Sequence, residues 1–294
     1  MEPDYVRLKD IKPALSGYIR EAAALLKEKP VPDEVAVHDV RVLMKKSRAV
    51  MKLISGQIDA ESFKRDYESL REVGRILCSW RETSVHRKIL KELKRENQKL
   101  FSAIKNNEKL DLLMKKPEIP AGEPPENIRN DLENIIELLD KTGYRIRFQT
   151  LDNLTPGSLL KELENTYGIV VDKYITCRNS PKPANIHELR KKTKDLLYQL
   201  WFFRPLHPQS VKSLEKKLDT IAQDLGKYND LTQLVTAIGY EYAGPSVNPA
   251  LDELILVIRQ EQDRYLSRVW PSASRIFRPG QKLVTMLGFR ILMI

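Results

Sequence analysis

The chain has 294 residues, and its 50 Lys and Arg against 40 Asp and Glu give a formal net charge of +10 at pH 7. This balance excludes an acidic surface of the kind that attracts cationic partners. Hydrophobic residues make up 41% of the chain, which is enough for one large domain or two helical halves and argues against a wholly disordered protein.

Proline and glycine divide the chain into a series of periodic segments rich in Leu, Ile, Glu, Lys and Arg. These segments predict helices over residues 4–28, 36–55, 60–79, 83–107, 126–142, 156–178, 184–204, 209–227, 230–241 and 248–270. No segment has a strand pattern, so we expect an all-α protein. The stretch from Lys115 to Glu126 contains four prolines and a glycine, which indicates a linker that connects two halves. We assign residues 1–150, with this linker, to the N-terminal half and residues 151–294 to the C-terminal half.

The two halves share a motif. The sequence HDVR at His38 recurs as HELR at His187, an offset of 187 − 38 = 149 residues. Further along, Gly74 within Val-Gly-Arg is matched by Gly226 within Leu-Gly-Lys, an offset of 226 − 74 = 152. Because the register drifts by only three residues, we infer two similar helical halves, each a four-helix bundle.

Each motif begins a basic stripe on a helix. In the first, the polar residues follow a 3,4,3,4 spacing that places them within roughly 80° of one another on the helix. In the second, H-x-x-R-x-x-x-K recurs and ends at a tyrosine. The two stripes consist of His38, Arg41, Lys45, Arg48 and Lys52, and of His187, Arg190, Lys191, Lys194 and Tyr198. Like charges at these spacings repel, so a stripe that occurs twice favours anion binding over simple solvation.

The next helix in each half carries further cations at matching positions. Lys64 and Arg75 in the first half correspond to Lys216 and Lys227 in the second at the offset of 152, and Arg71 lies between the first two. Glu68 and Asp219 lie close to the same faces. Ligand contacts and surface salt bridges are therefore both open for these residues.

Other polar residues have simpler interpretations. We interpret His86 and His207 as solvated or capping residues, and Asn229 and Asp230 as helix caps. The mixed charges of residues 84–100 indicate a solvent-facing surface. The three tryptophans are interpreted as core or interface anchors; they are Trp80, Trp201 and Trp270.

Two cysteines, Cys78 and Cys177, in a chain of this length are typical of a reducing compartment and of free thiols. The first ten residues do not form a secretory signal, and no apolar run reaches the roughly 18 residues of a membrane span. We therefore expect a cytoplasmic location. The apolar tail from Leu283 to Ile294 is short and contains Arg290, which favours a docked terminal helix over an anchor.

The paired motifs resemble those of the CHAD family, the conserved histidine α-helical domains, over about residues 4–270. The most specific elements are four residues of each stripe and the segments Gly74…Arg81-Glu82 and Gly226…Asn229-Asp230. The stripe residues are His38, Arg41, Lys45 and Arg48, and His187, Arg190, Lys194 and Tyr198. The resemblance implies two four-helix bundles related by a pseudo-twofold axis, with the basic helices facing a central groove or pore that binds inorganic polyphosphate. It departs at Arg81-Glu82, where family members usually carry Arg-Asp, and it does not cover the tail beyond Pro279.

The function predicted from the residues and the resemblance together is non-catalytic binding of inorganic polyphosphate, with no metal or cofactor. For the cytoplasmic location, this ligand leaves association with polyphosphate granules open. All ten stripe residues and the five further cations are the predicted binding residues. General nucleic-acid binding is the first alternative, since basic stripes suit the phosphates of any polymer. A phosphoanhydride hydrolase using His38 or His187 as acid or base is the second.

Overall fold

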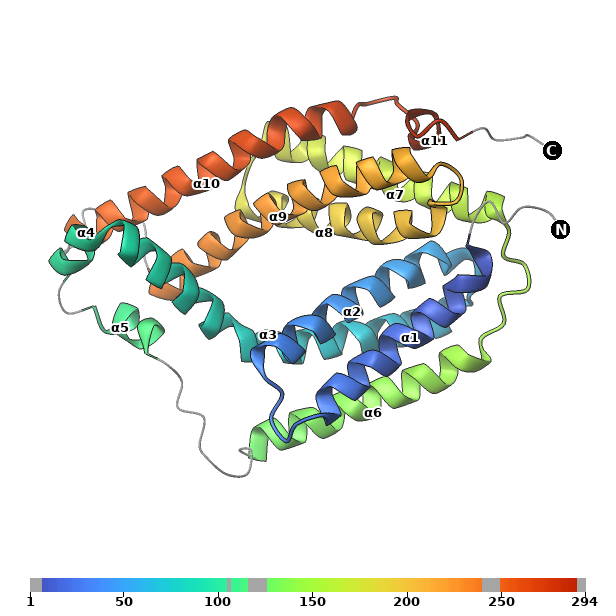
Figure 1. Ribbon diagram of the computed structural model, residues 1–294, viewed down its shortest axis with the longest axis horizontal. Coiled ribbons are helices and arrows are strands. Elements are labelled where there is room, and N and C mark those ends of the chain that lie inside the picture. Colours follow the sequence, from blue (N-terminus) through green and yellow to red (C-terminus); the bar gives the residue numbers. More distant parts are fainter. Residues whose placement is uncertain (1–6, 105–106, 116–125, 240–248, 290–294) are drawn as a thin grey trace.

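The computed structural model describes residues 7–104, 107–115, 126–239 and 249–289, without the side chains of residues 79 and 81–84. Within these ranges the regular structure is entirely helical, as the sequence predicts (Figure 1). The long helices are α1 (Leu8–Lys27), α2 (Glu34–Leu53), α3 (Ala60–Glu96), α6 (Glu126–Phe148), α7 (Pro156–Asn179), α8 (Pro183–Leu200), α9 (Pro208–Ile238) and α10 (Pro249–Ile276). Short helices are η1 (Ser55–Gln57), α4 (Gln98–Ala103), α5 (Glu108–Met114), η2 (Trp201–Phe203) and α11 (Leu283–Met286).

Two predicted helix breaks are wrong. The break expected between residues 79 and 83 falls inside α3, which runs through residues 60–96 because Ser79–Thr83 contains neither proline nor glycine. The break expected between residues 227 and 230 falls inside α9. Gly226 lies just before this point, inside the helix, and its lack of a side chain leaves room for Arg190 of α8.

The helices pack in two sets. In the first set α1 contacts α2 and α6, and α3 also contacts α2 and α6. In the second, α7 packs on α8, α8 on α9, and α9 on α10. The two sets meet chiefly where α2 crosses α8, and one cluster of buried apolar side chains runs from α1 through to the tail.

A second apolar cluster lies at the far end of the molecule, at the left in Figure 1. The C-terminal part of α3 leaves the first set there and, with α4 and α5, packs against α9 and α10. Leu90 of α3, Leu234 of α9 and Ile258 of α10 are all fully buried in this cluster. The length of α3 thus ties the first set of helices to the end of the second.

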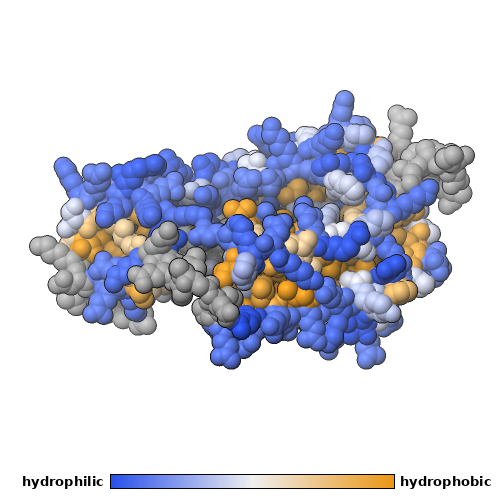
Figure 2. Space-filling model, turned by 60° about the horizontal axis from the view of Figure 1, so that its bottom comes forward, coloured by the Kyte–Doolittle hydropathy of each residue, from blue (hydrophilic) through white to orange (hydrophobic). Residues whose placement is uncertain are grey.

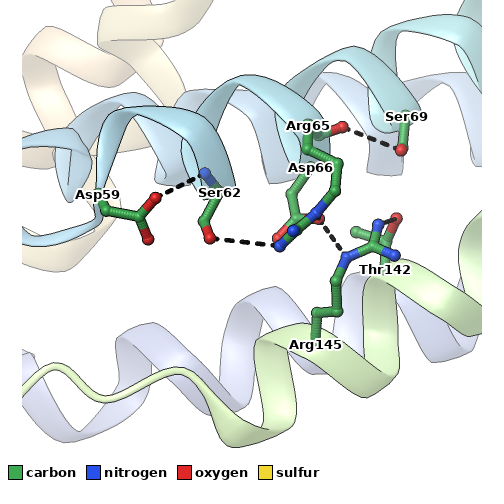
Figure 3. A network of polar contacts seen from close by, with 7 residues as sticks. All are labelled: Asp59, Ser62, Arg65, Asp66, Ser69, Thr142 and Arg145. Atoms are coloured by element: carbon green, nitrogen blue, oxygen red, sulfur yellow. Dashed lines mark hydrogen bonds and ion pairs between the residues drawn. The ribbon is translucent and has the colours of Figure 1, made fainter.

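A polar network fastens α6 to α3 (Figure 3). Asp66 of α3 is only 3% exposed, and its carboxylate accepts hydrogen bonds from Arg65 on the same helix and from Arg145 on α6. Arg145 also donates to the hydroxyl of Thr142, 3.1 Å away. A buried carboxylate requires such partners, so this network fixes how α6 lies against α3.

The tail docks as expected over the part that the structure describes. Leu283, Val284, Leu287 and Phe289 are buried in the main core. The backbone N–H groups of Leu283 and Val284 donate to the Glu164 carboxylate of α7 at 3.1 and 2.6 Å. Residues 290–294 lie outside the described residues.

Among the described residues, no helix combines the length and the apolar character needed to cross a membrane.

Candidate functional site

A pocket of about 430 Å³ lies where α2 and α3 face α8 and α9, and we call it the cationic pocket. Seven arginines and lysines line it against one carboxylate, that of Asp230. Three of its four walls therefore carry basic side chains, and the concentration of like charge makes it attractive to anions. The lining residues are Arg41, Lys45, Arg48, Arg71, Gly74, Arg75, Cys78, Val85, His86, His187, Arg190, Lys191, Asn229, Asp230 and Gln233.

Arg41 and Arg190 hold corresponding places in the two basic stripes, and each lies beside a glycine of the following long helix. Arg41 donates from Nη1 to the carbonyl oxygen of Gly74 at 3.1 Å. Arg190 lies against Gly226, where an added Cβ would be 3.1 Å from its Nε. The Nε of both arginines is buried and has no hydrogen-bond partner among the described residues. Buried donors are rarely left unpaired, so each guanidinium group keeps unused hydrogen-bonding capacity beside the pocket.

Arg48 completes a group of three, because its Nε donates only to the carbonyl oxygen of Met44 at 3.3 Å. In the described part of the chain, Arg41, Arg48 and Arg190 form no ion pair with a carboxylate. An anion entering the pocket thus meets three guanidinium groups that form no ion pair with any described carboxylate, although Asp230 also lines the pocket. Guanidinium donors match the oxygens of phosphate with forked geometry.

Other cations at the pocket do carry a carboxylate partner. Arg71 pairs with Glu68 at 3.1 Å, and Arg75 pairs with Glu72. The hydrogen bonds from Arg75 lower the pKa of Glu72. The sequence left two roles open for Arg71 and Arg75, surface salt bridges and contacts to a ligand. In the structure these side chains form surface salt bridges and also line the pocket.

Lys191 is paired in the same way. It donates to Glu188 at 2.7 Å, and although burial opposes ionisation of this carboxyl, Lys191 lowers the pKa of Glu188. These exposed pairs are weak, so a phosphate can replace the carboxylate at little cost.

His187 contacts α9 through Asn229, with 3.0 Å between Nδ1 and Oδ1. With the amide assigned in this orientation, Nδ1 carries the proton and donates to the amide oxygen. The interpretation of Asn229 and Asp230 as helix caps is therefore wrong, since both lie inside α9 and line the pocket.

The interpretation of His86 is also wrong, whereas that of His207 is confirmed. His86 is 7% exposed and lines the pocket. Arg71, Arg75, Cys78 and His86 share one face of α3 at spacings of 4, 3 and 8, but the predicted break at residues 79–83 hid this pattern. His207 caps α9, because its Nδ1 accepts a hydrogen bond from the backbone N–H of Ser210.

Lys52 lies outside the cationic pocket and instead joins α2 to α8. Its ammonium group is 2.6 Å from the carboxylate of Asp195. Burial opposes its charge, but Asp195 outweighs this effect and raises the pKa of Lys52. A second contact joins the same two helices, because the buried amide of Gln199 donates to the carbonyl oxygen of Ala49 at 3.0 Å. These two contacts hold α2 and α8 together where they cross.

Lys194, Tyr198 and Lys216 lie further along α8 and α9. The Lys194 ammonium is 2.9 Å from the Asp219 carboxylate and 5.7 Å from the centre of the Tyr198 ring. Burial raises the pKa of Tyr198 to about 12. Tyr198 and Lys216 line a second pocket of about 470 Å³, together with Lys46 of α2.

The three remaining predicted residues, His38, Lys64 and Lys227, are exposed and are not among the residues that line either pocket. The side chains of Arg81 and Glu82, part of the family-like segment, lie outside the described residues. Arg87 belongs to residues 84–100, which the sequence predicts to face solvent. Only 11% of its side chain is exposed, and it contacts Glu34 at 3.4 Å.

The paired arginines, each beside a glycine of the following helix, invite comparison with known proteins. The CHAD domain family matches residues 14–238, which is more than three quarters of the chain. The chain belongs to the CHAD domain family. A comparison with curated protein sequences gave no match. The matched range of this CHAD domain includes every residue that lines the cationic pocket.

Proposed function

We propose that this CHAD protein binds inorganic polyphosphate without cleaving it, and that the cationic pocket is the centre of the binding site. The observation that carries the proposal is the group of three arginines, Arg41, Arg48 and Arg190, that have no carboxylate partner within the described ranges. Polyphosphate offers a closely spaced row of anionic oxygens, which can engage all three guanidinium groups at once.

The chain contributes to the site from two similar halves. Arg41 and Arg190 are 149 residues apart, and both lie beside a glycine of the next long helix and keep a buried, unpaired Nε. This correspondence supports an internal repeat in which two helical bundles, within residues 1–150 and 151–294, present their basic helices to one groove.

The second pocket extends the path along which a polyphosphate chain can bind. Lys194 lies between the two pockets along α8, and Lys46, Lys212 and Lys216 line the second one. A chain of phosphates that leaves the three arginines can follow these lysines, which attract it as point charges. Affinity must then fall as salt rises, because binding releases counterions.

Nucleic acid is the first alternative ligand. The cationic pocket contains no Phe, Tyr or Trp among its described lining residues, so it offers no aromatic ring of these types for base stacking. The composition of the cationic pocket favours a polymer that is phosphate alone. The second pocket does offer aromatic rings, those of Tyr18, Tyr198 and Trp201, so the comparison with DNA is the deciding test. The hydrolase alternative rests on His187, whose Nδ1 is held by Asn229, and on the carboxylate of Asp230 in the same pocket.

The first experiment is calorimetric titration of the full chain with long-chain polyphosphate, single-stranded DNA and double-stranded DNA at two salt concentrations. We expect polyphosphate binding to persist at the higher salt, where DNA binding is lost. Equal, salt-sensitive binding of all three polymers would contradict a dedicated site. Release of inorganic phosphate from polyphosphate, followed over hours, would contradict the non-catalytic role, provided that His187→Ala abolishes it.

Variants localise the site. Arg41→Ala with Arg48→Ala, and separately Arg190→Ala with Lys194→Ala, should each weaken polyphosphate binding by about 10- to 100-fold, since charge-assisted hydrogen bonds are lost. The matched control is Lys141→Ala with Arg264→Ala, which removes the same charge from exposed pairs on α6 and α10. Equal losses in the control and the site variants would show that only net charge matters.

A further inference from the structure

A groove between α1 and α6, on the far side of α1 from α8, is separate from both pockets of the proposed polyphosphate site. It has a volume of about 780 Å³. On the face that turns α6 forward, hydrophobic side chains reach the surface between bands of hydrophilic ones (Figure 2). We call this groove between the two helices the α1–α6 groove. None of its lining residues lines either pocket of the proposed site.

The floor of the α1–α6 groove is apolar and smooth. Ile19 and Ala23 of α1 and Leu139 of α6 are at most 8% exposed and lie at its base. Gly143 brings the two helices close together, because a Cβ there would be 3.3 Å from a methyl group of Ile19. Small residues on a floor between two helices allow the backbone of a third helix to approach closely.

Two large aromatic side chains stand at one end of the groove. Tyr144 lines it, and Phe148 follows one turn later, with 4.8 Å between the ring centres. They are 68% and 63% exposed, among the most exposed large hydrophobic residues that the structure describes. Exposed aromatic pairs of this kind are typical of interface anchors, which become buried only when a partner binds.

The rim of the groove is positively charged. In the described part of the chain, neither Arg20 nor Arg147 has a hydrogen-bond or ion-pair partner, and the guanidinium of Arg147 lies 5.9 Å from the centre of the Phe148 ring. The single acid at the groove, Asp140, is already paired with Lys27 at 3.5 Å. Two cations are therefore left without a counter-charge beside an apolar floor.

We propose that the α1–α6 groove is a docking site for an acidic amphipathic helix of a partner protein. Two helices form its walls, so a third helix can lay apolar residues at i, i+3, i+4 and i+7 along the floor. Acidic residues on the flanks of that helix meet Arg20 and Arg147. The lined part of α1, residues 16–27, spans about 17 Å, or three turns of such a helix.

A second copy of this chain fits the groove less well than an acidic helix. In a twofold dimer the groove would face itself, so two concave surfaces would leave space between them. Arg20 and Arg147 would also meet their own copies, and this like-charge contact is unfavourable.

The test uses the full chain and a fluorescent 18-residue helical peptide with leucines at the four anchor spacings and glutamates on the flanks. A peptide of identical composition with the leucines scrambled is the first control, because it keeps the charge and loses the apolar stripe. Fluorescence anisotropy should show binding of the striped peptide with Kd in the range of about 1–100 µM, and at least about tenfold weaker binding of the scrambled one. No binding of the striped peptide up to 1 mM, or equal binding of the two, would overturn the proposal.

Variants then place the peptide. Tyr144→Ser with Phe148→Ser should weaken binding of the striped peptide by about tenfold or more. Arg20→Glu with Arg147→Glu should do the same and should improve binding of a peptide with lysine flanks. The matched control, Leu112→Ser with Leu256→Ser, removes apolar residues elsewhere that are 68% and 55% exposed, and it should change nothing.

Three results would assign the groove to something else. A loss in the control equal to that in the groove variants would mean that the peptide binds nonspecifically. A concentration-dependent dimer that Tyr144→Ser with Phe148→Ser abolishes would mean that a second copy occupies the groove. Binding to vesicles of anionic lipid through the same residues would mean a membrane surface. Polyphosphate binding by the same variants is measured in parallel and should be unchanged, so this proposal and the proposed function fail independently.

Discussion

The guanidinium group of Arg190 lies directly against the backbone of Gly226, where a Cβ would come within 3.1 Å of Nε and 3.3 Å of Nη2. The absence of a side chain at Gly226 therefore leaves room for the guanidinium group of Arg190. A side chain at position 226 would push Arg190 away from the place it holds in the cationic pocket.

Gly226→Ala should therefore weaken polyphosphate binding several-fold while changing stability little. The alanine gains up to about 1 kcal/mol in helix propensity, and this gain offsets part of the close contact with Arg190. Titration with polyphosphate measures the affinity, and thermal unfolding measures the stability. The control is Gly168→Ala in α7, where a Cβ meets nothing within 4 Å; it should leave affinity unchanged. If both variants bind alike, Gly226 does not position Arg190 for the ligand.

Asp219→Asn should strengthen polyphosphate binding by a few-fold. The Asp219 carboxylate holds Lys194 at 2.9 Å and competes with phosphate for it, so its removal frees one cation. The salt dependence of binding should become steeper by the equivalent of about one further ionic contact. Asp224→Asn is the control, because Asp224 pairs with Arg268 on α10, away from both pockets. Weaker binding in Asp219→Asn would place the path of the polymer elsewhere.

Asp66→Ala should lower the free energy of unfolding by about 3 kcal/mol, because it removes a buried carboxylate and leaves the partly buried guanidinium of Arg145 without its partner. Asp66 is 3% exposed and holds Arg145 of α6 against α3 (Figure 3). Denaturant titration measures the loss. Asp59→Ala, which removes only the N-cap of α3, should cost about 1 kcal/mol. Polyphosphate affinity below the unfolding transition should be equal in the two variants and the parent, since neither residue lines the cationic pocket or the second pocket.

Stability should fall as pH rises above about 9. Burial raises the pKa of Cys177 to about 11 from its ordinary value of 9.0. A thiol whose pKa is raised in the folded state contributes stability that is complete below the unfolded pKa and is lost as pH rises through the folded one. The loss from Cys177 therefore spans pH 9 to 11, and the burial of Tyr198 adds a loss between pH 10 and 12.

Cys177→Ala tests this directly. The variant should be less stable near pH 7, because it removes a fully buried side chain, but its stability should fall less steeply between pH 9 and 11. Chemical denaturation at a series of pH values gives both quantities. An unchanged slope would mean that the Cys177 thiol titrates alike in the folded and unfolded chain.

The sequence alone determined the helical class, the approximate place of most helices and the two basic stripes. These features are local, because helix periodicity and proline breaks act within a few turns. The same reasoning is wrong at residues 79–83 and 227–230, where α3 and α9 continue through the expected breaks. In α3 no proline or glycine interrupts residues 79–83, and in α9 the side chain of Arg190 packs against Gly226. His86, Asn229 and Asp230 were misread for this reason, since each lies on a helix that was expected to stop.

Only the tertiary structure decided which members of the stripes share a pocket. Arg41, Arg48 and Arg190 meet because α2 crosses α8, whereas Lys52 at the end of the same stripe turns to Asp195. Spacing along a helix tells which residues share a face but not what that face meets, because contacts between distant segments depend on how whole helices pack. The α1–α6 groove has the same origin, since it exists only where two helices more than a hundred residues apart in sequence lie side by side.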